Sequence, residues 1–250
     1  MKFVSWNCNG ALRNKTGLLD QLDADILVIQ ECEDPAQIHG AYEQWAGNYL
    51  WRGKSKHKGI GVFARKDHRL RKLDWTGEFA LQIAGLNHRT LAWNSEDLEL
   101  FLSVMINHDL PLLAVWTKQA SSKNFGYIGQ FWLYMQIHKQ RLRNPNQIIC
   151  GDFNSNKIWD ENDRLWNHSD VVAELNSLGI RSLYHEKMLE QQGEENCATF
   201  FLHRKNEKPY HIDYVFVSEE KLQQATLNVL NEDYWLNHSD HIPIEFALPQ

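Results

Sequence analysis

The sequence lacks several features that mark specialised classes of protein. No apolar run approaches the length that spans a bilayer, and the N-terminal segment is too short and too polar for a signal peptide. There is no linker rich in proline, glycine or serine, no internal repeat and no low-complexity tract. With 250 residues, of which 43% are apolar, the chain can build one large core or two small ones. We therefore expect one domain over residues 1–250 and no membrane partner.

Cysteine is also scarce. The four cysteines, Cys8, Cys32, Cys150 and Cys197, are scattered and show no spacing typical of a metal site. Three of them lie inside apolar, strand-like runs. This pattern predicts buried free thiols in a reducing compartment, and therefore a cytoplasmic protein.

An excess of positive charge is absent too, because 26 lysines and arginines are outnumbered by 32 aspartates and glutamates, which gives a net charge of −6. This balance argues against a protein coated in basic surface. The basic residues nevertheless concentrate in three segments, 52–72, 138–143 and 203–208. Such runs are usually solvated surface, but three of them on an acidic protein could also collect around one anionic ligand.

The pattern of apolar residues predicts strands interleaved with a few helices. Residues 24–30 form a continuous apolar run, as in a strand covered on both faces. Residues 127–143 have helical spacing, and residues 171–178 form a second helical segment that Gly179 ends. Many strands with few helices predict an α/β fold of two packed sheets with helices outside. The other expected strands are 2–8, 59–65, 98–106, 110–117, 198–202, 211–218, 225–230 and 242–248.

The segment 148–154 is the most informative part of the chain. It is a short apolar run that ends in Gly-Asp-Phe-Asn. Alternate residues of a strand point the same way, so Asp152 and Asn154 should project together from a buried strand end while Phe153 points into the core. A carboxylate beside a carboxamide is suited to positioning a water and stabilising charge on a phosphoryl group.

Similar polar groups lie at four further strand ends. Buried charges are costly unless they are paired or bound to metal, so a repeated pattern of this kind predicts one shared site. An acidic set with carboxamides and a histidine suits a hard divalent cation such as Mg²⁺. The side chains are Asn7 and Asn9 at the first strand end, Glu31 after the second, His211 and Asp213 on one face of 211–218, and Asp240 and His241 before the last strand.

The order of these motifs resembles that of the endonuclease/exonuclease/phosphatase superfamily. The motifs are WNCNG, IQECE, GIGVFAR, GDFNSN, HIDYVFVS and SDHIPI, and together they extend over nearly the whole chain. The superfamily includes exonuclease III-like DNA repair enzymes, DNase I-like nucleases, inositol polyphosphate phosphatases and sphingomyelinases. The resemblance implies a DNase I-like four-layer α/β sandwich, in which two packed mixed sheets are flanked by helices.

The resemblance also implies a metal site. Glu31 matches the metal-binding glutamate of the family, and Asn7 matches an asparagine that lies at the metal site and contacts phosphate. Asp240 would complete this set of metal-site residues. The implied cofactor is Mg²⁺ or Mn²⁺, acting as a Lewis acid on a phosphoryl oxygen.

The same resemblance assigns the hydrolytic roles. Asp152 would orient or deprotonate the attacking water, and Asn154 would hold the phosphate or the aspartate. Asp213 matches an aspartate that supports the site. Asp240 would orient His241, and His241 would contact the scissile phosphate as it gains charge.

One position departs from the family pattern. Many members carry a histidine or tyrosine at the end of the strand before the long central helix, where this sequence has Trp116 and Thr117. A tryptophan cannot act as an acid, but Thr117 could donate a hydrogen bond and the following Lys118 could supply a charge. Any acid step could also depend on a metal-bound water or on His211.

Two groups of side chains could bind the substrate. Trp116 and Trp159 lie close in sequence to the chemistry and could stack on a base. The segment with Lys54, Lys56 and Lys58 leads directly into GIGVFAR and could contact backbone phosphates.

The sequence therefore predicts a metal-dependent phosphoesterase with a nucleic acid, most readily DNA, as its substrate. A phosphatase or phosphodiesterase acting on a small phosphorylated molecule is the close alternative. A binding module that has lost turnover is a third, although it need not have kept Glu31, Asp152, Asn154 and His241 together. Fold alone does not choose among these substrates.

Overall fold

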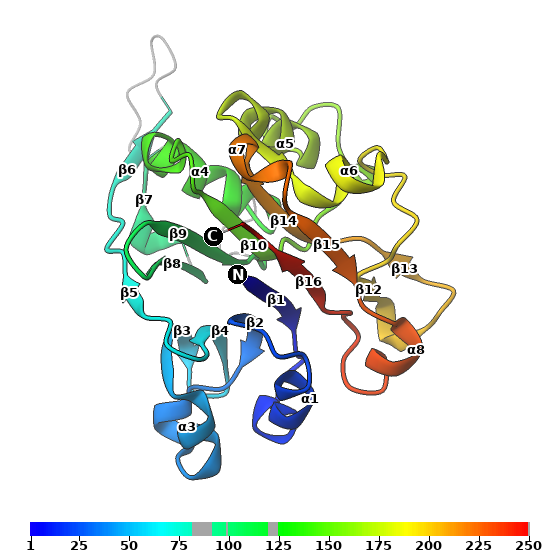
Figure 1. The fold of residues 1–250 in the computed structure, drawn as a ribbon. Coiled ribbons are helices and arrows are strands. Elements are labelled where there is room, and N and C mark those ends of the chain that lie inside the picture. The colour runs from blue at the N-terminus through cyan, green and yellow to red at the C-terminus, as the bar shows by residue number, and fades with distance from the viewer. Residues whose placement is uncertain (82–91, 99, 120–124, 250) are drawn as a thin grey trace.

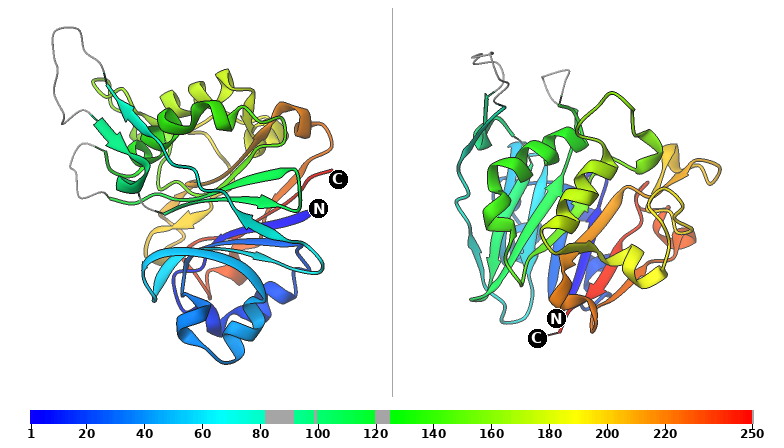
Figure 2. Two further views of the ribbon diagram at one scale, coloured as in Figure 1. Left: turned by 90° about the vertical axis from the view of Figure 1, so that its left-hand side faces the viewer. Right: turned by 90° about the horizontal axis from the view of Figure 1, so that it is seen from above.

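The computed structural model describes residues 1–81, 92–98, 100–119 and 125–249. Two six-stranded sheets pack face to face, and helices cover the outer face of each sheet (Figures 1 and 2). The arrangement has the four layers that the sequence predicts.

The first sheet has the strand order β15-β16-β1-β2-β4-β3. Strands β1 and β2 are parallel, and the other neighbours are antiparallel. The strands are β1 (Lys2–Asn7), β2 (Ile26–Cys32), β3 (Asn48–Ser55), β4 (Lys58–Ala64), β15 (Thr226–Val229) and β16 (Ile244–Ala247).

The second sheet has the order β11-β14-β10-β9-β8-β5, with β9 and β10 parallel. The turn at residues 107–109 joins β8 to β9 as a hairpin, as expected from the sequence. The strands are β5 (Leu70–Lys72), β8 (Phe101–Ile106), β9 (Leu110–Trp116), β10 (Ile148–Asp152), β11 (Ile180–Ser182) and β14 (Asp213–Ser218).

Helices and short paired strands complete the described chain. The helices are α1 (Thr16–Asp20), α2 (Pro35–Ile38), α3 (Ala41–Ala46), α4 (Ile128–Leu142), α5 (His168–Ser177), α6 (Leu183–Met188), α7 (Glu219–Leu222) and α8 (Glu232–Trp235). Short 3-10 turns are η1 (Leu12–Asn14), η3 (Ser95–Asp97), η4 (Lys157–Trp159) and η5 (Leu202–Arg204). Two small two-stranded sheets pair β6 (Glu78–Ala80) with β7 (Ala92–Asn94) and β12 (Phe200–Phe201) with β13 (Pro209–Tyr210).

The alternation of side chains along the strands separates the core into layers. Phe3, Ile148 and Val215 belong to the core between the sheets, whereas Trp6 and Phe216 pack under the outer helices. The central strands of both sheets carry polar residues at one edge of the sandwich. Because β1 and β2 end there, β9 and β10 end there and β14 begins there, these polar groups meet.

Candidate active site

Asp152 lies at the centre of this edge and has no exposed surface. Its Oδ2 accepts hydrogen bonds from Asn7 Nδ2 at 2.9 Å and from Asn154 Nδ2 at 2.9 Å, and its Oδ1 accepts from the Asn154 backbone N–H at 2.8 Å. Asn154 adopts a left-handed conformation, with φ of 45°, that folds it back over the aspartate. The two asparagines therefore fix the carboxylate from both sheets, and Asn154 contacts the aspartate directly.

Asn7 also connects this cluster to the loop that carries His241. Its Oδ1 accepts from the Asn9 backbone N–H at 3.0 Å, so Asn9 mainly forms the turn after β1. The Ser239 hydroxyl donates to the Asn7 backbone carbonyl at 2.7 Å and accepts from the His241 backbone N–H at 3.1 Å. Ser239 thereby ties the residues before β16 to the end of β1.

His241 is held by Asp213 and not by Asp240. The distance between His241 Nδ1 and Asp213 Oδ2 is 2.8 Å, and both side chains are buried. The Asp240 carboxylate instead contacts the Ser239 hydroxyl at 3.4 Å. Because Asp213 occupies the Nδ1 atom of the ring, the expectation that Asp240 orients His241 is wrong.

His241 also lies close to Asp152, with 4.0 Å between Nε2 and Oδ2. Burial lowers the pKa of His241, but the charges of Asp213 and Asp152 outweigh burial and raise it to about 9. Burial raises the pKa of Asp152 to about 7, despite the opposing effect of the His241 charge. At neutral pH the site therefore combines a protonated imidazole with a carboxylate that can accept a proton.

A divalent cation has oxygen donors available here. Among the described residues, Asp152, Asp213 and His241 form one cluster whose ligand atoms all lie within 4.8 Å of one another. The 2.8 Å hydrogen bond between Asp213 and His241 occupies the Nδ1 atom, so this trio functions better as a hydrogen-bonded relay than as a complete ligand set. The carboxylates still supply the hard oxygen atoms that Mg²⁺ and Mn²⁺ prefer.

Glu31 reaches the same edge because of a β-bulge. The register of β2 against β4 shifts between Gln30 and Cys32, and Glu31 has a φ of 61°. A bulge of this kind redirects a side chain that would otherwise follow the strand alternation. The Glu31 carboxylate forms an ion pair with the Lys58 ammonium, and 19% of the Glu31 side chain is exposed. Lys58 is therefore a partner of the expected metal ligand in addition to any role toward phosphate.

At the end of β9, Trp116 and Thr117 are not available for the substrate contacts expected of them. Trp116 is only 6% exposed and packs in the core between the sheets, where it pairs in register with Asp152, so it cannot stack on a base. The Thr117 hydroxyl is buried and donates to the Phe153 carbonyl, so it is not available to a substrate. Lys118 is exposed, with its ammonium 5.3 Å from the centre of the Trp116 ring.

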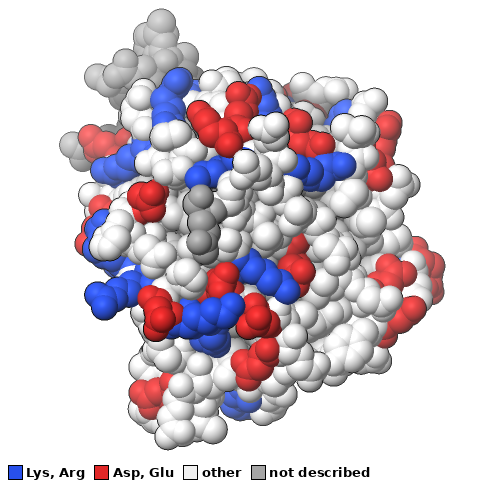
Figure 3. Space-filling model, viewed as in Figure 1, with Lys and Arg blue, Asp and Glu red and all other residues white. Residues whose placement is uncertain are grey.

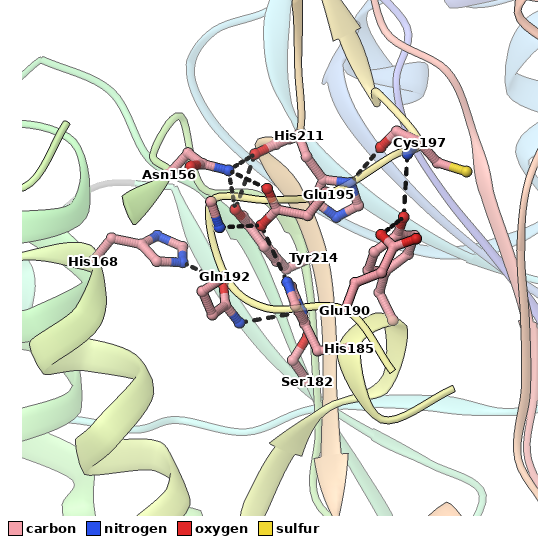
Figure 4. A network of polar contacts seen from close by, with 12 residues as sticks. Asn156, His168, Ser182, His185, Glu190, Gln192, Glu195, Cys197, His211 and Tyr214 are labelled. Atoms are coloured by element: carbon pink, nitrogen blue, oxygen red, sulfur yellow. Dashed lines mark hydrogen bonds and ion pairs between the residues drawn. The ribbon is translucent and has the colours of Figure 1, made fainter. Parts of the chain in front are cut away.

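His211 turns away from the catalytic residues. Strand β14 begins only at Asp213, so the alternation expected from 211 onward does not apply. The His211 Nδ1 donates to the Cys197 carbonyl at 2.7 Å (Figure 4). The His211 ring packs against Tyr184. The expectation that His211 and Asp213 share one face is therefore wrong, and His211 belongs to a neighbouring polar network.

The basic segment 52–72 does not form one surface. Lys54, Lys56 and Lys58 lie at the active-site end of the β3–β4 hairpin, whereas Lys66 binds Asp25 at the far end of the sheet. Arg52 donates to the Phe101 and Leu98 carbonyls between the sheets. Figure 3 shows the end that carries the termini, where acidic and basic side chains alternate.

The other two basic segments also separate. Segment 138–143 ends α4 at the far end of the sandwich, where Lys139 pairs with Glu174. Segment 203–208 lies between β12 and β13, next to the bridge between Phe200 and His241. Two basic groups therefore lie near the catalytic residues. They are segment 203–208 and the hairpin lysines of segment 52–72, which are Lys54, Lys56 and Lys58.

Several residues of this region gave no signal in the sequence. Asn156 donates to the His211 carbonyl at 2.9 Å, the Tyr214 hydroxyl at 3.1 Å and Glu195 Oε2 at 3.1 Å. Thr199 accepts the Ile212 and Asp213 backbone N–H groups on its hydroxyl, each at 3.0 Å, and thus fixes the start of β14. Glu195 and Thr199 lie in the loop between α6 and β12, where no strand or helix period applies, and Asn156 is simply the last residue of GDFNSN.

The expectations for cysteine and for membrane spans can also be compared with the structure. Cys8, Cys32 and Cys150 are buried free thiols, as expected, whereas Cys197 is exposed. In the described part of the chain, no helix is long and apolar enough to cross a membrane.

Comparisons with solved structures return the same architecture. NExo from Neisseria, a 3′ phosphatase bound to a product DNA hairpin, matches with a TM-score of 0.69 at 18% identity over 100% of both chains. The catalytic domain of APE2 from Xenopus laevis matches with a TM-score of 0.65 at 18% identity, over 99% of this chain and 91% of that one. An AP endonuclease from Archaeoglobus fulgidus matches with a TM-score of 0.65 at 14% identity over 100% of both chains.

These likenesses confirm the predicted DNase I-like fold. None of the curated proteins matches the chain. A model of the Endonuclease/Exonuclease/phosphatase family matches residues 4–241, which confirms the resemblance that the ordered motifs indicated. Since that match extends over nearly the whole sequence, the chain belongs to the Endonuclease/Exonuclease/phosphatase family.

Proposed function

We propose that this protein is a divalent-metal-dependent hydrolase that cleaves phosphodiester bonds in DNA. One observation carries the proposal: a buried Asp152, clamped by Asn7 and Asn154, lies 4.0 Å from a His241 that Asp213 holds. A proton acceptor, a cationic donor and neutral amide donors are thus gathered at one edge of the sandwich. This combination suits attack of a water on a phosphate.

Each of these side chains has a role that follows from its contacts. Asp152 accepts the proton of the attacking water, since its raised pKa places it close to neutrality. The protonated His241 donates a hydrogen bond to a phosphoryl oxygen as charge develops there. Asn7 and Asn154 hold Asp152 in one orientation, and Asp213 does the same for His241.

Glu31 is the proposed principal ligand of Mg²⁺ or Mn²⁺, supported by Asn7 and Asp240. The bulge at Glu31 directs a partly exposed carboxylate toward the site, and a carboxylate is the ligand these ions prefer. When bound, the cation neutralises charge on the phosphoryl oxygens. Lys58, the ion-pair partner of Glu31, is exposed at the end of the β3–β4 hairpin and would be the lysine nearest to a bound phosphate.

Nucleic acid is the proposed substrate, with a small phosphorylated molecule as the second candidate. Exposed lysines on the β3–β4 hairpin and an exposed Trp159 near the site favour a polymer with phosphates and bases. NExo, one of the structural relatives, is bound to a product DNA hairpin. We also infer that residues 1–250 act as one domain in the cytoplasm, because both sheets contribute to a single inner core and the cysteines are unpaired.

A hydrolysis panel tests the proposal. Plasmid DNA, single-stranded DNA, RNA, phosphoinositides and a generic diester are offered with Mg²⁺, with Mn²⁺ and with a chelator. We expect metal-dependent cleavage of DNA that Glu31→Gln abolishes and that the exposed control Glu43→Gln retains. Cleavage of only small phosphoesters would select the second candidate, and binding without any turnover would select an inactive phosphate-binding module.

A further inference from the structure

A hollow of about 160 Å³ lies beside the catalytic residues, and none of the roles above uses it. At about 30 Å³ per liquid water, it could hold roughly five water molecules. It is therefore too small for an extended ligand but suitable for a single planar ring. Its lining residues are Asn156, Ile158, Gly193, Glu195, Asn196, Ala198, Pro209, Tyr210 and His211.

The floor of the hollow carries a buried carboxylate. The Glu195 side chain is only 4% exposed and accepts hydrogen bonds from His185 Nε2 at 3.1 Å, Gly193 N–H at 3.0 Å and Asn156 Nδ2 at 3.1 Å (Figure 4). Burial raises the pKa of Glu195, but these donors outweigh burial and hold it at about 2. The carboxylate is thus ionised at neutral pH.

The histidine that contacts Glu195 is held from its other side as well. The Ser182 hydroxyl and the Gln192 amide nitrogen lie 2.7 Å and 3.1 Å from His185 Nδ1, while Nε2 donates to Glu195. A buried negative charge on the floor of the hollow favours a ligand with N–H donors.

The rim of the hollow is apolar and aromatic. Ile158 and Trp159 are 54% and 43% exposed. The centre of the Trp159 ring lies 5.2 Å from that of the Tyr210 ring, and Tyr210 lines the hollow. Such a surface offers a stacking face to a planar ring.

A continuous series of rings connects the rim to the catalytic histidine. The ring centres of Tyr210 and Phe200 are 6.3 Å apart, and those of Phe200 and His241 are 4.6 Å apart. The hollow is therefore within reach of a nucleotide adjacent to the one whose phosphate contacts His241.

We propose that this hollow is a subsite for an unpaired nucleobase of the substrate strand, and that it prefers bases with an exocyclic amino group. Trp159 and Tyr210 stack on the base, and Glu195 accepts from its amino group, as acidic side chains do from cytosine N4. This inference rests on the proposed function, since it requires a nucleic acid at the catalytic residues.

The test compares tails that differ only in their bases. Hairpin DNAs carry a short single-stranded tail of dC, of dT or of abasic spacers, and their affinities are measured by fluorescence anisotropy in an Asp152→Asn background that blocks turnover. Stacking is worth about 1–3 kcal/mol per base, so Trp159→Ala should weaken dC-tail binding roughly 5- to 150-fold. The abasic tail, which keeps the phosphates, should bind unchanged.

Two further variants complete the experiment. Tyr234→Ala removes an aromatic side chain of similar exposure, 45%, on α8. It should change neither the affinity for the dC tail nor the affinity for the abasic tail. Glu195→Gln should remove a preference of roughly tenfold for the dC over the dT tail. Its melting temperature is checked because Glu195 has buried partners, and the Trp159→Ala result is independent of that variant.

The outcomes separate this inference from the proposed function. If Trp159→Ala weakened the binding of dC and abasic tails equally, or weakened neither, the proposed base subsite would be wrong. Absence of metal-dependent diester hydrolysis in the wild-type protein would instead refute the proposed function.

Discussion

His241 lies between two buried carboxylates, and the contact with Asp213 decides how its ring can act. The 2.8 Å hydrogen bond fixes Nδ1, so Nε2 is the atom that can meet a phosphoryl oxygen. The motif order suggested Asp240 for this task because it precedes His241 in the chain. The partner is instead Asp213 on β14, which meets the loop before β16 only in the folded protein. Adjacency in the sequence does not reveal this contact.

Replacing each aspartate by asparagine distinguishes the two assignments. Asp213→Asn should lower turnover about 10²- to 10⁴-fold, because it removes the group that orients His241 and keeps it protonated. It should also lower the pKa of His241, which a histidine NMR titration measures directly. Asp240→Asn is the matched control and should leave that pKa nearly in place. The reverse ranking of the two variants would restore Asp240 as the orienting residue.

His168 gives a second test at the residue scale, this time of stability. The ring is buried, with Nε2 3.0 Å from Gln192 Oε1 and Nδ1 3.2 Å from the Ser155 hydroxyl. Burial lowers its pKa to about 4, outweighing the opposing effect of Gln192. The unfolded chain therefore binds a proton more readily than the native state, so stability is complete above the ordinary pKa of about 6.5 and is lost as the pH falls toward 4.

This shift has a measurable size. Between about pH 7 and about pH 5, His168 should reduce the free energy of unfolding by roughly 2 kcal/mol. Urea unfolding of wild type and of His168→Gln at the two pH values isolates this contribution, because the variant lacks it. An identical pH dependence in both proteins would show that the ring titrates normally.

Among the elements, β10 is the one on which the site depends most. Gly151 has a φ of 143°, and a Cβ at this position would lie 1.9 Å from the Val115 carbonyl oxygen of β9. Only glycine permits β10 to approach β9 closely enough for Asp152 to reach the edge beside Trp116.

Gly151→Ala should therefore destabilise the protein by about 2–4 kcal/mol. Thermal or urea unfolding measures this decrease, and Gly17→Ala, where no neighbouring atom lies within 4 Å of the added Cβ, is the matched control. Equal stability of the two variants would mean that β10 and β9 can separate without cost.

The elements also show what the sequence can and cannot predict. Alternation along β1, β10 and β14 correctly gathers Asn7, Asp152 and Asp213 at one edge, since regular strands obey a period of two. The bulge at Glu31 and the turn at His211 break that period, and neither has a sequence signature. The burial of Trp116 likewise follows from the packing of the second sheet on the first, which is a tertiary effect.

Charge is organised at the scale of the whole molecule. The net charge of −6 excludes a generally basic surface, and the structure divides the basic segments between the two ends of the sandwich. A polymer at the catalytic edge would therefore meet the hairpin lysines but not Arg69 and Arg71, which are exposed at the far end.

Salt dependence of DNA binding tests this division. Lys54→Glu with Lys56→Glu should weaken binding and reduce the slope of log affinity against log salt by about 0.7–0.9 for each phosphate that the hairpin no longer neutralises. Arg69→Glu with Arg71→Glu makes the same change of charge at the other end and should leave the slope nearly unaltered. Lys58 is kept in both proteins because it contacts Glu31. Equal effects of the two pairs would indicate attraction by net charge alone.

The family match makes the chain a phosphoester hydrolase, and Asp152 is the residue on which the proposed chemistry depends. Asp152→Asn preserves the shape of the side chain but removes its ability to accept a proton. The decisive measurement is the single-turnover rate of DNA cleavage with Mg²⁺, together with DNA affinity, for wild type and Asp152→Asn. We predict a rate lower by about 10²–10⁴-fold with affinity nearly unchanged. A wild-type rate, or a decrease in affinity in proportion to the decrease in rate, would contradict the assignment of Asp152 as the base.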